Sequence, residues 1–282
     1  MGAGRLVAID GHNLLFRMFY GVPARVYSRD GKLINGVIGF IAAVLRYIRS
    51  FRPEYALVVF DSEKSSGRAA AYEEYKGTRR SDFSNCADEE NPFSQLGYAK
   101  DVLDMLGVKY CEIDGYEADD VLASYAGLKR DLHVCIVSAD SDLLQLVKEN
   151  VVVYADRGKT GVLYDREMVR EKYGIWPESI VDYKALVGDR SDNIPGVPGI
   201  GHKTAVKLIE TYGGVDRLKK AVLPGVLGEK IRSNLAVVEA NRSLIRLYGQ
   251  ASLALPLGDL QIDCKAYEDK KTMGVLREAK II

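Results

Sequence analysis

The sequence has few cysteines and no stretch that is long and apolar enough to cross a membrane. Its four cysteines, Cys86, Cys111, Cys135 and Cys264, are far apart, and no two of them form a C-x-x-C pair. This spacing argues against a zinc ribbon and against a disulfide framework, and favours reduced, mostly buried thiols. The N-terminus has no charged leader followed by a long apolar stretch, and no apolar run approaches the roughly 20 residues that span a bilayer. We therefore expect a cytoplasmic protein without a membrane partner.

The chain also has no net charge, since 39 Lys and Arg balance 39 Asp and Glu. This balance argues against a uniformly basic nucleic-acid binder but permits local asymmetry. The stretch 199–250 carries nine Lys or Arg against four Asp or Glu, so acid must be in excess elsewhere. The three histidines, His12, His133 and His202, are too scattered to indicate a metal site.

Short apolar runs alternate with helical patterns, which is typical of an α/β fold with a mostly parallel central sheet and flanking helices. We expect five strands, at Leu6–Ile9, Ala56–Phe60, Val108–Ile113, His133–Val137 and Val151–Tyr154. Apolar residues at helical spacing predict helices at Val37–Phe51, Gln95–Leu106 and Asp119–Leu128. Beyond about Trp176 the strand pattern stops and helical segments with glycine and proline follow. The sequence thus predicts an α/β domain at 1–176 and a helical domain at 177–282.

Residues 62–95 interrupt this alternation of strands and helices. From Ser62 to Asn91 the chain is poor in large aliphatic residues and changes from basic to acidic. An insertion of this length without a core-facing stripe is either a functional loop or a disordered one. Tyr72 and Tyr75 are interleaved with basic residues there, and their rings can stack on nucleic-acid bases.

Three of the expected strands end in an aspartate, at Asp10, Asp61 and Asp140. The carboxyl ends of parallel strands lie on one edge of the sheet, where open α/β folds bind ligands. A single aspartate after a strand is commonly a helix cap or a turn residue, but three of them weaken that interpretation. Six further carboxylates stand in three acidic motifs: Glu117, Asp119, Asp120, Asp142, Asp189 and Asp192. We expect all nine to meet at one sheet edge.

Nine carboxylates at one edge would repel one another strongly. At an effective dielectric constant of about 20, two of them about 4 Å apart repel by about 4 kcal/mol, so the cluster requires cations. Oxygen ligands without paired His or Cys favour Mg²⁺ or Mn²⁺ over zinc. Two such ions can activate a water and stabilise the leaving oxygen of a phosphodiester. The pattern predicts two-metal hydrolysis, with a third ion left open, and needs no Ser–His–Asp nucleophile.

The segment 188–210 combines two of these aspartates with a glycine-rich turn that opens a helix. Its glycines permit positive φ and close backbone approach, so that amides at the helix start can face a phosphate: Gly196, Gly199 and Gly201. Lys203 and Lys207 add positive charge on that face. An ordinary turn between two helices is the alternative, and the neighbouring carboxylates count against it.

In order along the chain, these motifs resemble the 5′ nuclease family, and most of all the N-terminal 5′-3′ exonuclease domain of bacterial DNA polymerase I and its free-standing bacterial and phage relatives. The resemblance extends from about Leu6 to Leu247 without a missing acidic motif, through I-D-G, F-R-M-F-Y, N-G-V-I-G-F, V-V-F-D, R-A-A-A-Y-E-E-Y-K-G-T-R, G-Y-E-A-D-D-V, S-A-D-S-D-L-L-Q-L-V and G-D-R-S-D-N-I-P-G-V-P-G-I-G-H-K-T-A. The chain departs from the family pattern at Ala69, where a histidine is frequent, and at Ser141, where Lys or Arg is usual.

The resemblance implies a PIN-like nuclease core with two divalent ions, a helical arch within 62–95, and a helix-hairpin-helix at about 188–210 that grips duplex DNA. It implies structure-selective cleavage where a 5′ flap or 5′ end meets duplex, in replication and repair, by a monomer in the bacterial nucleoid. The expected catalytic residues are Asp61, Lys76, Arg79 and Asp120. DNA contacts are expected at Arg17, Arg68, Tyr72, Tyr75, Lys76, Arg79, Gly196, Gly199, Gly201, Lys203, Thr204 and Lys207. K⁺ is expected on backbone carbonyls between Gly196 and Gly201.

Two other classes of function stay open. A PIN-type ribonuclease or a phosphatase would use a similar sheet, but such a ribonuclease would lack the hairpin and the arch. A haloacid-dehalogenase phosphatase needs an aspartate where this chain has His12. A non-catalytic DNA-structure-binding module would have lost carboxylates, and none is lost. The sequence leaves open the balance of exonuclease and flap cleavage, the choice between DNA and an RNA primer, and whether the chain is free-standing or part of a polymerase.

Overall fold

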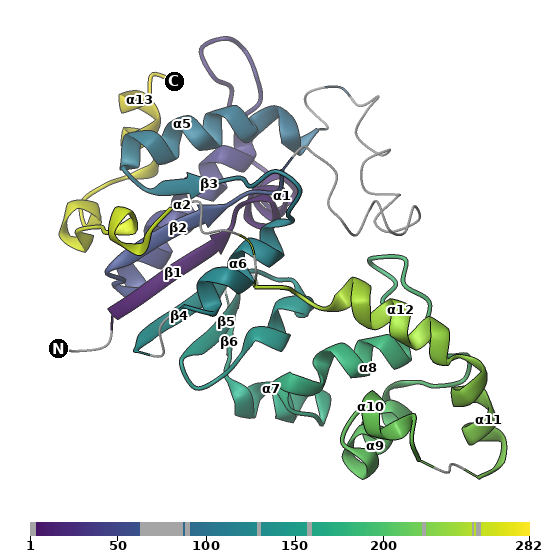
Figure 1. Ribbon diagram of the computed structural model, residues 1–282. Helices are drawn as coiled ribbons and strands as arrows, with labels where there is room; N and C mark the ends of the chain where they lie inside the picture. The colour runs from purple at the N-terminus through teal and green to yellow at the C-terminus, as the bar shows by residue number, and fades with distance from the viewer. Residues whose placement is uncertain are drawn as a thin grey trace.

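The computed structural model of the chain describes residues 4–62, 87, 91–128, 131–156, 160–221, 224–249, 251 and 255–282. Its strands form one six-stranded sheet in the order β3-β2-β1-β4-β5-β6 (Figure 1). They are β1 (Gly4–Asp10), β2 (Tyr55–Val59), β3 (Lys109–Cys111), β4 (Leu132–Val137), β5 (Val151–Asp156) and β6 (Gly161–Tyr164). The first five are parallel, and β6 pairs antiparallel with β5. The five expected strands are therefore confirmed, whereas the edge strand β6 was not expected.

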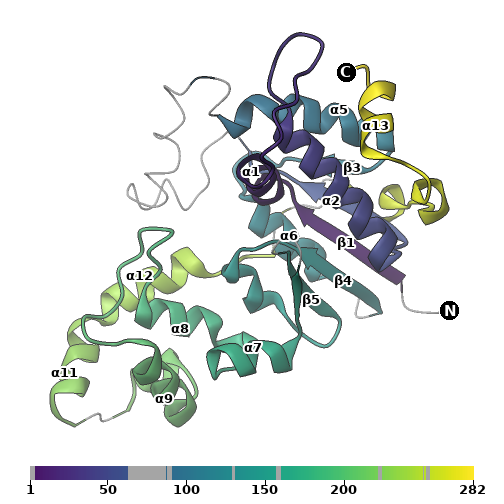
Figure 2. The same ribbon diagram turned by 180° about the vertical axis from the view of Figure 1, so that it is seen from behind.

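Helices lie on both faces of this sheet, as the front and back views show (Figure 2). The α-helices are α1 (Gly11–Gly21), α2 (Asn35–Phe51), α5 (Leu96–Leu106), α6 (Ala118–Ala126), α7 (Arg166–Tyr173), α8 (Ile180–Val187), α9 (His202–Tyr212), α10 (Val215–Leu218), α11 (Gly225–Ser233), α12 (Leu235–Ile245) and α13 (Thr272–Glu278). Short 3₁₀ helices are η2 (Pro92–Gln95), η3 (Ser141–Leu146), η4 (Pro177–Ser179), η5 (Leu257–Leu260) and η6 (Cys264–Tyr267). None of the helices in the described ranges is long and apolar enough for a membrane crossing.

Each face of the sheet has its own hydrophobic core. In β1, Leu6 and Ala8 belong to the core that includes α6 and α8, whereas Val7 and Ile9 belong to the core that includes α1, α2 and α5. A parallel strand covered on both sides is apolar at consecutive positions, which is why the sequence showed continuous apolar runs. The five parallel strands end at one edge, and three of the predicted ligands follow those ends: Asp10, Asp61 and Asp140.

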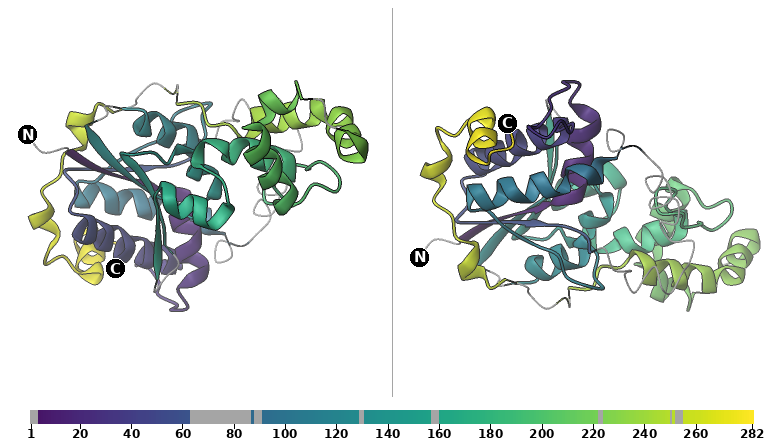
Figure 3. Two further views of the ribbon diagram at one scale, coloured as in Figure 1. Left: turned by 90° about the horizontal axis from the view of Figure 1, so that it is seen from below. Right: turned by 90° about the horizontal axis from the view of Figure 1, so that it is seen from above.

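The chain after the helical region returns to the sheet. Helices α8 to α12 project beyond one end of the sheet, and residues 257–282 then run back along the core (Figure 3). Tyr267 donates a hydrogen bond of 2.8 Å to the carbonyl of Leu106, and Val275 and Leu276 are buried in the core of α2 and α5. The last segment of the expected helical domain of 177–282 therefore lies apart from α8 to α12, because its apolar side chains cover the α/β core. Of the predicted insertion at 62–95, most residues lie outside the described ranges.

Candidate metal centre and nucleic-acid interface

Three of the predicted ligands stand at neighbouring strand ends, and we call Asp10, Asp61 and Asp140 the strand-end group. Asp10 ends β1 and caps α1, where its carboxylate accepts a hydrogen bond of 3.0 Å from the amide of Asn13. Asp61 lies two residues beyond β2, and its Oδ1 accepts from the amide of Ala118 at 2.8 Å. Asp140 caps η3. Because β2, β1 and β4 are adjacent in the sheet, these aspartates share one edge.

The strand-end group is electrostatically strained. Burial raises the pKa of Asp10 to about 6, and the negative charges of Asp61 and Asp140 act in the same direction. Hydrogen bonds from Asn13 and Ser138 oppose the shift. A carboxyl with this pKa binds a proton well above the range usual for aspartate, so a cation at this edge would relieve the repulsion.

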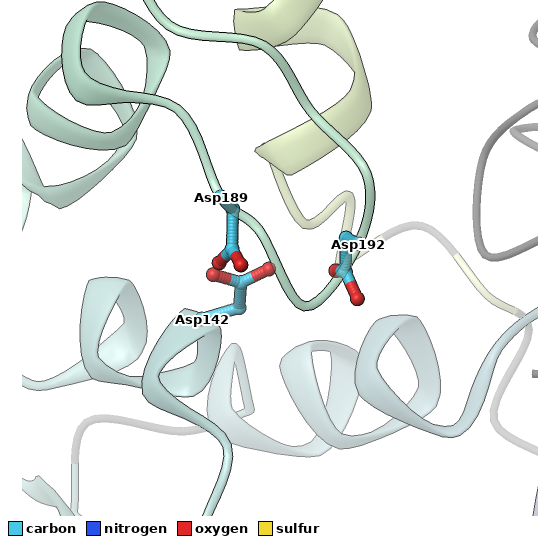
Figure 4. Close-up of side chains that lie close together, drawn as sticks. All are labelled: Asp142, Asp189 and Asp192. Carbon is cyan, nitrogen blue, oxygen red and sulfur yellow. The ribbon is translucent and has the colours of Figure 1, made fainter. Parts of the chain in front are cut away.

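The structure brings Asp142, Asp189 and Asp192 together as a second cluster, the loop group. One carboxylate oxygen from each lies within 4.8 Å of the others. Asp142 comes from η3, and the other two come from the loop after α8; Figure 4 shows the carboxylates of Asp142 and Asp189 facing each other, with Asp192 beside them. In the part of the chain that the structure describes, no other cluster of three acidic, His or Cys residues has such short spacings.

A lysine that the sequence analysis did not single out binds the loop group. Lys184 of α8 is 6% exposed, and its ammonium contacts the carboxylate of Asp142 and, at 2.8 Å, that of Asp189. A signal was present in the sequence, since Lys184 lies four residues after Ile180 on the buried face of α8. Lysine is rarely buried unless it is paired.

The two aspartates that Lys184 contacts have pKa values shifted in opposite directions. Burial raises the pKa of Asp142 to about 6, although Lys184 opposes this shift. Burial also acts to raise the pKa of Asp189, but Lys184 and the hydrogen bonds from Ser191 outweigh it and lower that pKa to about 2. Asp189 therefore stays ionised to a lower pH than Asp142.

Two glycines hold the loop between α8 and α9 in a tight crossing. Gly188 has a φ of +86°, and a Cβ there would lie 2.4 Å from the amide nitrogen of Gly196. A Cβ on Gly196 would in turn lie 2.1 Å from the carbonyl oxygen of Val187. Asp189 and Ile194 exchange two backbone hydrogen bonds of 2.9 and 2.8 Å. The crossing turns the chain so that its aspartates reach η3.

The three remaining predicted ligands, Glu117, Asp119 and Asp120, form the α6 group. Glu117 directly precedes α6, and the two aspartates lie in its first turn. Asp120 is buried and accepts a hydrogen bond of 3.1 Å from the backbone amide of Tyr248. The α6 group does not join the loop group at ligand spacing. All nine candidate donors are carboxylates, so their chemistry fits a hard divalent cation.

The predicted hairpin leads into α9, whose N-cap is Gly201 and carries no side-chain cap. Lys203 and Lys207 are exposed on this helix, and Thr204 is half-buried. The helix start therefore presents backbone amides beside two lysines, which is an arrangement that attracts phosphate.

Each of the three hairpin glycines has a different structural basis. Gly199 has the expected positive φ, +79°, and the Nζ of Lys230 lies 2.7 Å from where its Cβ would be. Gly196 is required by its close approach to Val187. Gly201 uses neither property within the chain: its φ is −101°, and nothing lies within 4 Å of a Cβ position.

Arg17, a predicted DNA contact, binds Asp156 in the structure. Its guanidinium donates to the carbonyl of Asp156 at 2.6 Å and pairs with the buried carboxylate of the same residue at 2.9 Å. Arg46 and Tyr47 of α2 also bind this carboxylate, so Arg17 links α1 to α2 and β5. Five other predicted DNA or catalytic residues lie outside the described residues: Arg68, Tyr72, Tyr75, Lys76 and Arg79.

Two family models match the chain. Residues 5–174 match the N-terminal resolvase-like domain of the 5′-3′ exonuclease family, and residues 175–268 match its C-terminal SAM fold. DNA polymerase I of Caldicellulosiruptor bescii is 36% identical over 275 residues, which cover 95% of this chain. The thermostable DNA polymerase I of Thermus thermophilus is 39% identical over 259 residues, which cover 90%. The chain spans 30% of the length of each relative.

The fold is similar to that of bacteriophage T5 5′-exonuclease. A structure of that enzyme with bound zinc ions has a TM-score of 0.71 and 25% identity, and covers 98% of this chain and 99% of its own. The T5 D15 flap endonuclease, in a pseudo-enzyme-product complex with DNA and metal ions, has a TM-score of 0.72 and 24% identity, with the same coverage.

Proposed function

The chain belongs to the 5′-3′ exonuclease family, and on this premise we propose that it hydrolyses DNA phosphodiester bonds by two-metal-ion catalysis, as a 5′-3′ exonuclease and 5′-flap endonuclease. The observation that carries the proposal is the loop group, whose Asp142 donates its backbone amide to Asp140 of the strand-end group, at the carboxyl edge of a mostly parallel sheet. Open α/β sheets bind their ligands at this edge. Since the chain spans 30% of its curated relatives, the proposal concerns nuclease activity alone.

The proposed metal ligands are the nine carboxylates, which would hold two Mg²⁺ or Mn²⁺ ions, with a third left open: Asp10, Asp61, Glu117, Asp119, Asp120, Asp140, Asp142, Asp189 and Asp192. When bound, such ions lower the pKa of an attacking water and stabilise the leaving oxygen. The T5 5′-exonuclease, which shares the fold, binds divalent ions, and this supports the assignment. Lys184 contributes a fixed positive charge that keeps part of the loop group together before any cation arrives.

The proposed substrate is DNA with a 5′ flap, or a 5′ end at a duplex junction. Amides at the start of α9, with Lys203, Thr204 and Lys207, would bind phosphates of the duplex. K⁺ on backbone carbonyls between Gly196 and Gly201 would strengthen that contact. We also propose that Lys76 and Arg79 lie beside the scissile phosphate, and that Arg17, Arg68, Tyr72 and Tyr75 contribute further DNA contacts.

The remaining proposals concern organisation. We propose a catalytic core at 1–176 with an arch insertion at about 62–95, followed by a DNA-binding helical domain at 177–282 with a helix-hairpin-helix at about 188–210. The two family models meet between residues 174 and 175, close to this boundary. We propose that the protein acts as a monomer in the bacterial nucleoid.

The test is cleavage of a 5′-flap duplex, single-stranded DNA and single-stranded RNA with and without Mg²⁺, with product lengths resolved. We expect Mg²⁺-dependent products from the flap substrate. Asp61→Ala and Asp120→Ala should each lower the rate by about two to three orders of magnitude, since a metal ligand contributes several kcal/mol to the transition state. Duplex affinity should change little, because Lys and Arg contacts supply it.

The exposed Asp259→Ala serves as the control and should cleave at the parental rate. Cleavage of RNA in preference to flap DNA would favour the PIN-type ribonuclease. Binding of flap DNA without any metal-dependent cleavage would favour the non-catalytic module. Unchanged cleavage by both Asp61→Ala and Asp120→Ala would contradict the two-metal assignment.

A further inference from the structure

His12 connects two neighbouring strand ends. It is the second residue of α1, which begins directly after Asp10, and its side chain is 11% exposed. Its Nδ1 accepts a hydrogen bond of 2.9 Å from the backbone amide of Asp61, beyond the end of β2. The turn that carries Asp10 therefore also fixes the backbone of Asp61.

The hydrogen bond determines which nitrogen of the imidazole carries the proton. A backbone amide is always a donor, so Nδ1 must offer its lone pair and the ring hydrogen lies on Nε2. Nε2 is enclosed and has no hydrogen-bond partner among the residues that the structure describes. Nδ1 also lies 3.3 Å from Oδ2 of Asp61, but its lone pair is already used, so this approach is a contact and not an ion pair.

Aromatic packing holds the imidazole in this position. The rings of Phe16, Phe60 and Phe93 stand edge-on to it, with centroids 6.1, 5.4 and 5.5 Å away. Gly11 leaves room for the arrangement, since a Cβ there would lie 2.4 Å from the Phe60 ring. The acceptor is thus presented to Asp61 by a rigid, apolar surround.

Two hydrogen bonds fix Asp61, one at its carboxylate and one at its backbone amide, and His12 accepts the second. The amide of Ala118 holds the carboxylate at Oδ1, whereas the amide of Asp61 itself is held by His12. We propose that His12 is a positioning residue, which orients Asp61 for cation binding beside Asp10 through the acceptor Nδ1. The inference rests on the proposed function, because it requires Asp61 to be a metal ligand.

If His12 served only to pack against its neighbours, its substitutions would give a different result from the one expected for a hydrogen-bond acceptor. Asparagine places Oδ1 as many bonds from the backbone as Nδ1 of histidine, so it can accept from the Asp61 amide. Leucine has almost the same shape as asparagine but presents a methyl group there. His12→Asn and His12→Leu both lose the aromatic ring, and they differ in the acceptor.

The experiment measures calorimetric binding of Mn²⁺ without DNA, the Mg²⁺ concentration for half-maximal flap cleavage, and hydrogen exchange at the Asp61 amide. In His12→Leu, we expect the dissociation constant for Mn²⁺ and the Mg²⁺ concentration for half-maximal cleavage to rise by about tenfold or more. A loss of this size is usual when a hydrogen-bond partner of a metal ligand is removed. The Asp61 amide should lose protection in this variant. In His12→Asn, the dissociation constant for Mn²⁺ and the Mg²⁺ concentration for half-maximal cleavage should stay within about threefold of the parental values. The Asp61 amide should stay protected from hydrogen exchange.

Equal metal binding by the asparagine and leucine variants would overturn the inference, whether both match the parental protein or both are impaired. If His12→Leu does not fold, His12→Gln takes its place, since its acceptor lies one bond too far out, and the same expectations apply. A parental protein that binds no Mn²⁺ and cleaves no flap would overturn the proposed function together with the inference. A parental protein that does both, with unaffected His12 variants, would overturn the inference alone.

Discussion

Lys184 is a buried cation whose partners are themselves predicted metal ligands. Lys184→Met leaves Asp142 and Asp189 facing each other without the ammonium that joins them. Breaking a buried ion pair in this way costs about 3–5 kcal/mol of unfolding free energy. We expect such a loss by urea unfolding in a chelator, and a smaller loss when Mg²⁺ is present to replace the missing charge.

Lys203→Met, at an exposed position, is the matched control and should change the unfolding free energy by less than about 0.5 kcal/mol. A Lys184→Met protein as stable as its parent would mean that the ion pairs contribute nothing net, as some buried pairs do.

The raised pKa of Asp10 predicts how stability changes with pH. Its pKa is about 6 in the folded chain and 3.8 for an unperturbed aspartate, so between these values the folded state binds more protons than the unfolded state. The contribution of Asp10 to the unfolding free energy is therefore fully present below pH 4 and is lost as the pH rises through 6. A rise in pKa from 3.8 to about 6 corresponds to about 3 kcal/mol.

Asp10→Asn should flatten the decline of unfolding free energy between pH 4 and pH 7, measured by urea titration in a chelator. Part of the decline should persist, since burial raises the pKa of Asp142 to about 6 as well. The exposed Asp131→Asn should leave the parental curve unchanged. Identical curves for Asp10→Asn and the parental chain would contradict the assigned shift.

Among individual residues, the shared edge of three aspartates could be predicted from the sequence, and the partners of the carboxylates could not. The ends of parallel strands share an edge, so the positions of Asp10, Asp61 and Asp140 along the chain were enough to place them together. Lys184 and His12 act through contacts across 42 and 49 residues of chain, with Asp142 and Asp61 respectively. Such pairings depend on how α8 and α1 are docked, which no local pattern records.

The loop between α8 and α9 contains two glycines, five residues apart, that substitution by alanine should affect differently. Gly196→Ala would place a Cβ 2.1 Å from the carbonyl oxygen of Val187, and the backbone would have to move. We expect a loss of about 1–3 kcal/mol in unfolding free energy, as for other overpacked sites. Gly201→Ala meets nothing within 4 Å and should cost less than about 0.5 kcal/mol.

Duplex affinity then tests the proposed role of the hairpin. If the backbone at Gly201 approaches a phosphate, Gly201→Ala should weaken binding although the protein remains as stable as its parent. The measurement is a duplex titration in Ca²⁺ to prevent cleavage, together with urea unfolding. Parental affinity in a stable Gly201→Ala protein would place the phosphate elsewhere.

Among the helices and strands, the buried ones were easier to predict from the sequence than the exposed ones. The strands β1, β2, β4 and β5 were found because they lie within the sheet and read as apolar runs, whereas β3 lies at an edge and was found because apolar Val108 and Ile113 flank it. The edge strand β6 has only four residues and is largely exposed, so its signal was weak. The return of residues 257–282 to the core was missed, since the apolar residues of α13 look like those of any amphipathic helix and do not say which core they join.

At the level of the whole molecule, α13 should stabilise the α/β core although it follows the helical region in the chain. Leu276 is fully buried against α2 and α5, so Leu276→Ala should lower the unfolding free energy by about 2–5 kcal/mol. Met273 on the same helix is 43% exposed, and Met273→Ala should cost less than about 0.5 kcal/mol. Hydrogen exchange should accelerate in α2 and α5 of the Leu276→Ala protein; acceleration confined to α9 would contradict this packing.

The return of the chain to the sheet also governs the order in which the protein can fold during synthesis. Tyr267 binds the carbonyl of Leu106 across 161 residues, and Arg49 binds that of Tyr267 across 218. Ribosomes add about 5–20 residues per second, so the segment that binds Leu106 follows it by on the order of ten seconds. During this interval the apolar sides of α2 and α5 lack their final cover. We therefore expect the nascent chain to expose a hydrophobic face until the whole helical region has been made, and chaperones act on surfaces of this kind.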